Sequence, residues 1–539
     1  MKPSFEVLRN EGNPPPPPRA TRRSIFATLR YFALWAAAAY CIYCYLFSKP
    51  LFAHPLPQHT GPYAVGAVDI EAPVSPPRAI HSARFKGTDE KAFELQTVLF
   101  TLYYPAAKGA ALTSRRRHTW IPDPLPLRAQ GYARAAHISN SITNAIFTYA
   151  IRALVGGITI PAAVGVPLSA RAFPTSQNRA TETSDAQQIL GDHLDAATSD
   201  NDLPPQRYPI IIFSHGTVSS RTDYSHYAGE LAARGHIVVM IEHRDGSCPG
   251  SVIMRHGSPN RTRLLFDESE VETADGNEID IEEFHRAQLN FREAEIEEAV
   301  RVMKAINSGK GGKVFQQNPR GEGLDLANWE GRLDTEGMVV AGHSYGATGA
   351  MQALRNGPSE KRPFKGAIIL DPGKQSGPLN RDISVPMLVV HSNSWSSHTS
   401  VFYGRAHFDT VKEIVVANNE RGNPSWFMTS IGTSHPSVTD APLLEPFLLS
   451  FTTGATIDVY QGLRQYVHVA EDFLAFLADG QKKGLLKEKA EFPQYDQGAI
   501  GLWKPGQSGG EEKTDEWWDW RRYWQIHVSP VGSVENEKK

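Results

Sequence analysis

A serine stands between glycines at residues 342–346, where the chain reads Gly-His-Ser-Tyr-Gly. An apolar run, 338–341, precedes this G-x-S-x-G pattern, and small residues that can begin a helix follow it. Such a setting is typical of a strand, tight turn and helix that hold the serine oxygen exposed near a helix N-terminus, where an oxyanion is stabilised. We therefore predict that Ser344 is the nucleophile of an acyl transfer. A second match, 506–510, has no apolar run before it and charged residues after it, so we interpret it as a flexible loop.

A serine hydroxyl is a weak nucleophile at neutral pH and needs a base that is oriented by an acid. On a sheet that carries this elbow, the order along the chain is serine, acid and histidine, each after a strand. Asp371 directly follows the apolar run 366–370, whereas Asp382 precedes a strand and the next strand leads to Asn393, which carries no charge. We predict that Asp371 is the acid.

The predicted base is His435, which follows the last strand-like segment, 426–431. His391 and His398 come too early in the strand order, and His343 lies inside the elbow, where we expect it to point away from the base position. Any one of these histidines could instead be structural, but the order favours His435.

An acyl transfer also needs two N–H donors for the oxyanion. The residue after the nucleophile, Tyr345, should supply one, and the loop after an early strand should supply the other. That loop reads Phe-Ser-His-Gly-Thr at 213–217, so we predict the N–H of Thr217 as the second donor.

No metal or cofactor site is predicted. Asp245, Asp267 and Glu268 are acidic but follow no recognised ligand spacing, and the three cysteines are too few and too scattered for a zinc cluster. The net charge of −3 gives no indication of nucleic-acid binding. No oligomeric state follows from the sequence.

Strand-like and helix-like segments alternate through the body of the chain, which predicts an α/β fold with a mainly parallel sheet flanked by helices. The predicted strands are 208–213, 236–241, 338–341, 366–370, 385–391 and 426–431, and the predicted helices are 224–234, 282–306 and 459–477. A further strand-like run, 93–104, is rich in β-branched and aromatic residues.

The N-terminal part differs in composition from the body of the chain. Residues 1–30 form a polar, proline-rich tail, 31–48 contain no charge, and 49–60 form a linker. We predict a transmembrane signal anchor over 31–48, with a cleaved signal peptide or a buried soluble helix as alternatives. The basic residues that flank this segment are Arg19, Arg22, Arg23 and Arg30 before it and Lys49 after it. The positive-inside rule then predicts a single-pass membrane protein with a cytosolic N-terminus and a catalytic domain in the endoplasmic reticulum or Golgi lumen, elsewhere in the secretory pathway, or outside the cell.

The predicted catalytic domain covers 61–490, with 171–206 as a mobile insertion. Residues 124–170 could cap an active site, touch lipid or pack in the core. The tail 491–539 contains a tryptophan-rich segment, Trp517–Trp524, which we expect to pack back on the domain rather than rest on a membrane.

Several segments resemble the plasma-type platelet-activating factor acetylhydrolases, also called lipoprotein-associated phospholipases. The matching segments, in family order, are GPYAVG (61–66), LYYPA (102–106), WIP (120–122), YPIIIFSHG (208–216), GHIVVMIEHRDGS (235–247) and GHSYGAT (342–348). The resemblance implies an α/β-hydrolase fold and a calcium-independent serine esterase that cleaves the sn-2 ester of phospholipids with short or oxidised acyl chains. It places the triad on Ser344, Asp371 and His435 and the oxyanion donors on Thr217 and Tyr345.

Three features depart from the family: Pro-Gly-Lys after Asp371, the insertion 171–206, and the N-terminal anchor in place of a secretory signal. Two other functions stay open. One is a related esterase acting on other small or polymeric esters. The other is a membrane-tethered binding protein on an inactive hydrolase fold, against which the complete set of serine, acid and histidine argues.

Overall fold

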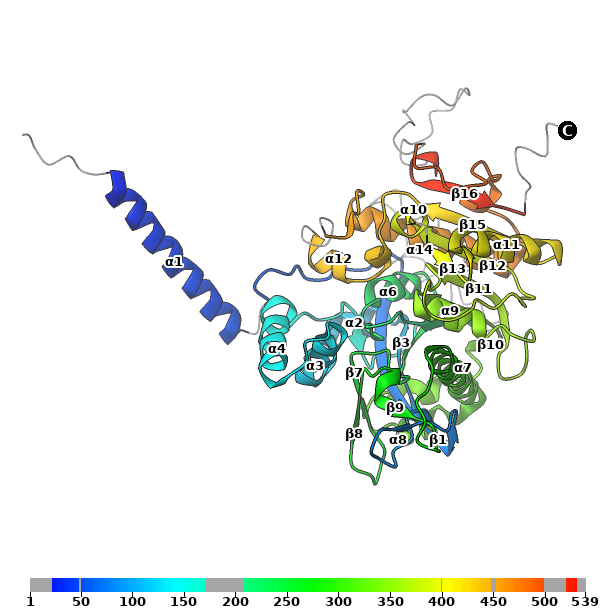
Figure 1. The fold of residues 1–539 in the computed structure, drawn as a ribbon, viewed down its shortest axis with the longest axis horizontal. Helices are drawn as coiled ribbons and strands as arrows, with labels where there is room; N and C mark the ends of the chain where they lie inside the picture. Colours follow the sequence, from blue (N-terminus) through cyan, green and yellow to red (C-terminus); the bar gives the residue numbers. More distant parts are fainter. Residues whose placement is uncertain are drawn as a thin grey trace, which may run out of the picture.

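One large β-sheet organises the chain (Figure 1). The computed structural model describes residues 22–47, 50–170, 207–398, 400–446, 452–498 and 520–530. In the described part of the chain the sheet has ten strands in the order β16-β15-β12-β11-β10-β5-β6-β3-β1-β4. These strands are β1 (Ala64–Ala79), β3 (Glu94–Ala106), β4 (Ala163–Val164), β5 (Tyr208–Ser214), β6 (Ile237–Glu242), β10 (Leu333–His343), β11 (Phe364–Leu370), β12 (Met387–Ser392), β15 (Ser425–Ser430) and β16 (Trp524–Val528).

The strand order identifies the architecture. Counted in chain order from β1, and without the short β4 and the last strand β16, the sheet reads 1-2-4-3-5-6-7-8. Only the second of these strands, β3, is antiparallel to its neighbours; the others pair in parallel. This is the arrangement of an α/β-hydrolase, with the elbow serine directly after the fifth strand.

In the described part of the chain, three two-stranded pairings lie outside the large sheet. They are β2 (Arg84–Phe85) with β9 (Val271–Glu272), β7 (Gly250–Ile253) with β8 (Arg261–Leu264), and β13 (Val401–Phe402) with β14 (Arg405–Ala406).

Helices cover both faces of the sheet, which is why central strands such as β6 are buried along their whole length. The helices are α1 (Arg22–Leu46), α2 (Lys108–Thr113), α3 (Leu125–Ala135), α4 (Ser141–Val155), α6 (Ser225–Ala233), α7 (Ile281–Ala305), α8 (Gly311–Gln317), α9 (Tyr345–Gln352), α10 (Asn393–Ser397), α11 (His407–Glu420), α12 (Ala441–Leu444) and α14 (Val459–Asp479). Shorter turns of helix are η2 (Glu268–Glu270), η3 (Ile306–Lys310), η4 (Leu324–Trp329), η5 (His435–Val438), η6 (Gly484–Lys487) and η8 (Trp520–Arg522).

The apolar residues form two main clusters, one on each face. Side chains of α7, α9 and α11 share one cluster with the sheet, and side chains of α6 and α14 share the other. In α7 the helical spacing that predicts an amphipathic helix is visible in the packing, since Ile296, Ala299, Val300 and Met303 all face the sheet.

The C-terminal segment adds a strand that the sequence analysis did not predict. β16 pairs antiparallel with β15 at the edge of the sheet, so the boundary predicted at residue 490 falls too early. Trp524 and Ile526 are buried against the α14 cluster, which confirms that this end of the tryptophan-rich segment packs on the domain. Trp517, like the insertion 171–206, lies outside the described residues.

The predicted transmembrane anchor is not supported. Helix α1 projects from the body of the molecule (Figure 1), yet within the described residues no helix has the length and apolar character that crossing a bilayer requires.

Candidate active site

The nucleophile elbow forms as the sequence predicts. Ser344 joins β10 to α9 with φ of 57° and ψ of −124°, a conformation that is strained for a residue with a side chain. A Cβ on Gly342 would lie 2.3 Å from the carbonyl oxygen of Gly346, and a Cβ on Gly346 would lie 1.9 Å from that of Ser214. Only glycine fits at these two positions, so the elbow depends on both.

The two predicted oxyanion donors lie beside the serine. Tyr345 is the first residue of α9, so its N–H has no acceptor within the helix. Within the described residues the N–H of Thr217 also has no hydrogen-bond acceptor, and Thr217 lines the same cavity as Ser344. Gly216 brings the loop close, since a Cβ there would lie 3.1 Å from the Cβ of Ser344.

Asp371 follows β11 directly, with a positive φ of 45°. Its carboxylate accepts the N–H of Ser392 at 2.6 Å and the hydroxyl of Ser392 at 2.7 Å. The third contact is His435, whose Nδ1 lies 2.8 Å from Oδ2. Burial alone would raise the pKa of Asp371, but the imidazoles of His343 and His435 outweigh it and hold this pKa well below its ordinary value. The carboxyl is therefore ionised at neutral pH.

His435 begins the short turn η5, which follows β15 after a four-residue loop. The hydrogen bond to Asp371 uses Nδ1, which leaves Nε2 as the nitrogen available to a reacting group. The backbone N–H of His435 donates to the Oγ of Ser394 at 2.9 Å, and its side chain is 30% exposed. His435 and Ser344 line one cavity, so the structure brings the three residues predicted as a triad together.

The position of His343 differs from the expectation that it points away. Its ring lies 4.4 Å from that of His435, and it lines the cavity. Tyr224 Oη lies 2.8 Å from His343 Nδ1 and accepts the N–H of Gly216 at 3.2 Å. Burial, together with the neighbouring His435, lowers the pKa of His343 to about 4. A G-x-S-x-G pattern does not predict this packing, because the packing depends on the path of loops that are distant in the sequence.

The alternative acids and bases lie elsewhere. His391 is buried, its Nδ1 lies 3.2 Å from the Oγ of Ser396, and burial lowers its pKa well below the ordinary value. His398 and Asp382 are exposed. None of the three lines the cavity with Ser344.

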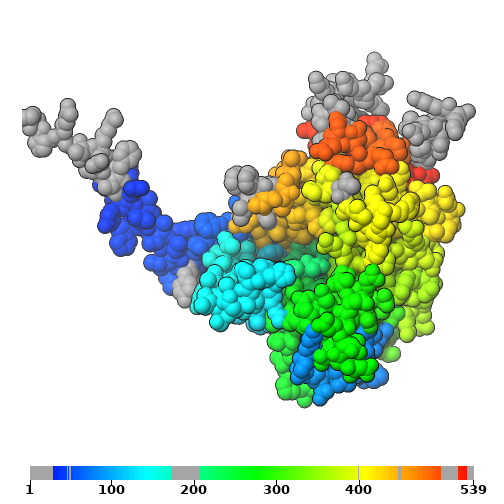
Figure 2. Space-filling view, in the orientation of Figure 1, coloured from blue at the N-terminus to red at the C-terminus, as the bar shows by residue number. Residues whose placement is uncertain are grey.

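The cavity beside Ser344 has a volume of about 720 Å³, within the usual range for small-molecule sites. One wall is built by α3 and α4, through residues that include Tyr132, Phe147, Ile151 and Leu154. No residue of α4 is buried, and Figure 2 shows α3 and α4 (cyan) on the surface beside the main body. Of the three roles considered for 124–170, the structure therefore favours a cap over the site.

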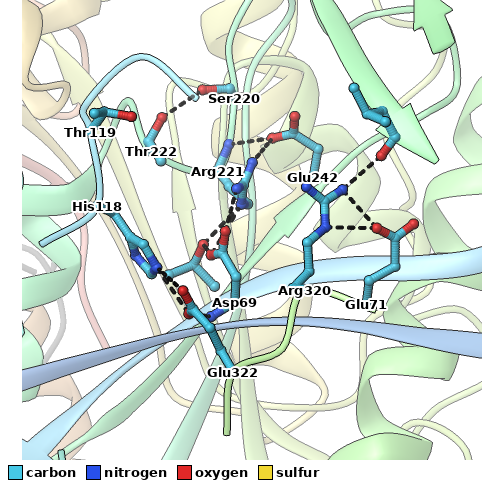
Figure 3. Close-up of polar contacts among 12 residues, drawn as sticks. Asp69, Glu71, His118, Thr119, Ser220, Arg221, Thr222, Glu242, Arg320 and Glu322 are labelled. Atoms are coloured by element: carbon cyan, nitrogen blue, oxygen red, sulfur yellow. Dashed lines mark hydrogen bonds and ion pairs between the residues drawn. The ribbon is translucent and has the colours of Figure 1, made fainter. Parts of the chain in front are cut away.

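A buried charge network fixes the loop after Thr217, and the sequence analysis missed it (Figure 3). Arg221 Nη2 donates to Asp69 Oδ2 at 2.6 Å and Nε donates to Thr101 Oγ1 at 2.9 Å, while its backbone N–H donates to Glu242 Oε2 at 2.9 Å. Removing one partner of a buried ion pair typically costs about 3–5 kcal/mol. The loop is thus tied to β1, β3 and β6.

Among the described residues, two groups could be considered for a metal. His215, Glu242 and Cys248 lie together, but Arg128 donates to both the Glu242 carboxylate and, at 3.0 Å, the Cys248 sulfur. The guanidinium already supplies the positive charge there. The other group consists of His343, Asp371 and His435.

The acidic residues singled out in the sequence have structural partners. Asp245 accepts from Arg292 Nε at 2.7 Å, and Asp267 accepts the N–H of Ser269 at 2.9 Å as the cap of η2. Glu268 begins that turn. None of these residues lines the cavity.

With this geometry in place, comparison with known proteins is informative. The family model described as "Platelet-activating factor acetylhydrolase, isoform II" matches residues 176–500. The chain belongs to this family. Its matching region includes the elbow, the acid and the histidine.

Individual relatives match over shorter stretches. The platelet-activating factor acetylhydrolase of Cavia porcellus is 31% identical over 206 residues, which cover 36% of this chain and 43% of that protein. A putative phospholipase A2 of Schizosaccharomyces pombe is 26% identical over 321 residues, which cover 57% of this chain and 60% of that protein. The chain thus spans about half the length of these curated relatives.

Among solved structures, a ferulic acid esterase from Streptomyces cinnamoneus shares 16% identity at a TM-score of 0.45. The match covers 81% of this chain and 96% of that chain. A likeness this remote carries no argument about function.

Proposed function

We propose that this chain is a calcium-independent serine esterase that hydrolyses the sn-2 ester of phospholipids whose sn-2 chain is short or oxidised. The observation that carries the proposal is the 2.8 Å hydrogen bond between Asp371 and His435 beside a cavity that both His435 and Ser344 line. Membership of the acetylhydrolase family supports the choice of ester.

In the first half of the proposed reaction, Nε2 of His435 takes the Ser344 proton while Oγ attacks the ester carbonyl. The carbonyl oxygen becomes an oxyanion, which the N–H groups of Thr217 and Tyr345 stabilise. The ionised Asp371 stabilises the imidazolium. His435 then gives its proton to the departing lysophospholipid oxygen, and the acyl group stays on Ser344.

In the second half, His435 takes a proton from water, which attacks the acyl-enzyme carbonyl. The same two N–H groups stabilise the second oxyanion. Collapse of this intermediate returns the proton to Ser344 and releases the carboxylic acid. Each step uses side chains of this chain and water, so none of them requires a metal ion.

The cavity favours an ester with an apolar acyl chain. Its walls are mostly aromatic and aliphatic, and no lysine or arginine is among the described residues that line it. A phosphate group would gain no charge-assisted hydrogen bond inside such a cavity. We therefore place the acyl chain against α3 and α4 and the polar head towards solvent.

Labelling with a fluorophosphonate probe, followed by turnover on phospholipids of rising sn-2 chain length, tests the proposal. We expect Ser344 to be labelled, the sn-2-acetyl phospholipid to be hydrolysed and turnover to fall as the chain lengthens, all unchanged by a calcium chelator. Hydrolysis of a short-chain chromogenic ester without phospholipid hydrolysis would favour an esterase for other substrates. Absence of both labelling and hydrolysis would favour an inactive binding protein.

A further inference from the structure

The imidazole of His435 lies between two other rings. The indole of Trp395 stacks on it with ring centroids 4.0 Å apart and planes at 11°, and the ring of His343 lies 4.4 Å away at 35°. A nearly parallel indole at 4.0 Å fills one face of the imidazole, so the two neighbours must lie on opposite faces. The catalytic ring is held as the middle layer of a stack.

Trp395 is itself fixed on its other side. Its Nε1–H donates to the carbonyl of Pro372 at 3.0 Å. The ammonium of Lys374 lies 4.4 Å from the indole centroid and donates to the carbonyls of Trp395 and His398, both at 2.8 Å. Because His435 fills one face of the indole, Lys374 lies over the other.

This arrangement gives a role to the Pro-Gly-Lys sequence after Asp371. These residues are not bulky, and the aromatic surface against the catalytic histidine comes instead from α10, after the next strand, β12. Pro372 and Lys374 hold that aromatic residue. The segment after Asp371 and α10 therefore act together to hold the indole against His435.

We propose that Trp395 is a positioning residue for the general base and that Lys374 fixes Trp395. This inference rests on the serine-esterase function proposed above. Tilting of the His435 ring out of its plane would break the stack, so the indole holds the ring plane in which Nδ1 meets Asp371. Trp395 does not line the cavity among the described residues, so it acts through His435 and not on substrate.

The stack also affects the charge that His435 acquires in the reaction. The titratable groups that face His435 or the indole stacked on it are Asp371, His343, Lys374 and His407. An indole face attracts a cation, so Trp395 stabilises the imidazolium. The ammonium of Lys374 repels the same cation through the indole.

The first test compares Trp395→Leu with Trp395→Phe on a short-chain chromogenic ester. We expect Trp395→Leu to lower kcat about ten- to a hundredfold while KM stays within twofold, because only the orientation of the base is lost. Trp395→Phe keeps a ring in the stack and should retain activity within about threefold. Tyr460→Leu, at an exposed aromatic residue, is the matched control.

The second test uses Lys374→Met, which keeps the length of the side chain and removes its charge. Loss of the ammonium should release the indole and lower kcat, by less than Trp395→Leu does, while KM stays within twofold. Lys361→Met, at an exposed lysine, should leave kcat unchanged. A merely structural role for the pair would not lower kcat at an unchanged KM.

The outcomes separate the two proposals. Wild-type protein that fluorophosphonate does not label refutes the esterase function itself. Labelled, active wild type together with a Trp395→Leu variant of equal kcat overturns the inference alone. If Trp395→Leu does not fold, Trp395→Met replaces it, and equal kcat values for the Met and Phe variants overturn the inference.

Discussion

Ser392 donates two hydrogen bonds to Asp371, one to each oxygen of the carboxylate: its N–H to Oδ1 at 2.6 Å and its hydroxyl to Oδ2 at 2.7 Å. Oδ2 is also the oxygen that faces His435 Nδ1. A carboxylate held at both oxygens cannot rotate. Ser392, the last residue of β12, therefore orients Asp371, the acid that follows β11.

Ser392→Ala should lower kcat by roughly ten- to a hundredfold, because a hydrogen bond to a charged group contributes about 1.5–3 kcal/mol. Its backbone N–H still holds one oxygen, so the loss should be smaller than for removing the acid. Steady-state kinetics on a short-chain ester measures this. Ser392→Thr keeps the hydroxyl and should restore activity; equal rates for wild type and Ser392→Ala would refute this role of Ser392.

Ser344→Ala should reduce turnover by about 10⁶-fold if these residues act as one catalytic unit. The change removes one oxygen that faces a cavity, so the fold should be retained, and circular dichroism checks this. Ser508→Ala, at the serine of the second G-x-S-x-G match, is the control and should change nothing. Equal activity of wild type and Ser344→Ala would show that Ser344 is not the nucleophile.

Asp371→Asn should reduce kcat by about 10⁴-fold, because an amide favours the wrong tautomer of His435. Asp382→Asn, at an exposed residue, should have a mild effect. The comparison needs kcat for both variants under the same conditions. A larger loss in Asp382→Asn would mean that the wrong carboxylate has been assigned.

The free energy of unfolding should fall as pH drops from about 7 to about 4. Burial lowers the pKa of six histidines to about 3 or 4, from an ordinary value of 6.5: His59, His215, His226, His343, His407 and His527. Below pH 6.5 the unfolded chain binds protons at these positions and the folded chain does not, so protonation favours unfolding. The lowered pKa of Asp371 acts in the same direction at still lower pH, since its contribution is lost as pH falls through the folded-state value.

Three carboxyls oppose this trend. Burial raises the pKa of Asp223 to about 6, that of Asp440 to about 7 and that of Glu295 well above its ordinary value. These raised values favour folding at lower pH, but the carboxyls are outnumbered by the histidines. Urea unfolding at several pH values measures the balance. His226→Gln should flatten the dependence, whereas His398→Gln, at an exposed histidine, should not. Stability that is constant or rises between pH 7 and 4 would contradict the prediction.

The sequence by itself determined the parts of this protein that depend on local geometry and chain order. The elbow at Ser344 follows from glycines at two positions where a Cβ would collide with backbone. Asp371 and His435 could be placed because residues that follow parallel strands meet at one edge of a sheet. Strand and helix periodicity likewise predicted β5, β6, β11, β12, β15, α7 and α14.

Only the tertiary structure decided which distant residues complete this site. Trp395 stacks on His435, Ser392 donates to Asp371, and Arg221 reaches back to β1. No spacing along the chain encodes such contacts, because they depend on the path of every loop between the partners. The edge strand β16 was missed for the same reason: a five-residue segment is stable as a strand here because β15 offers unpaired N–H and C=O groups, which is a property of the folded sheet and not of the segment.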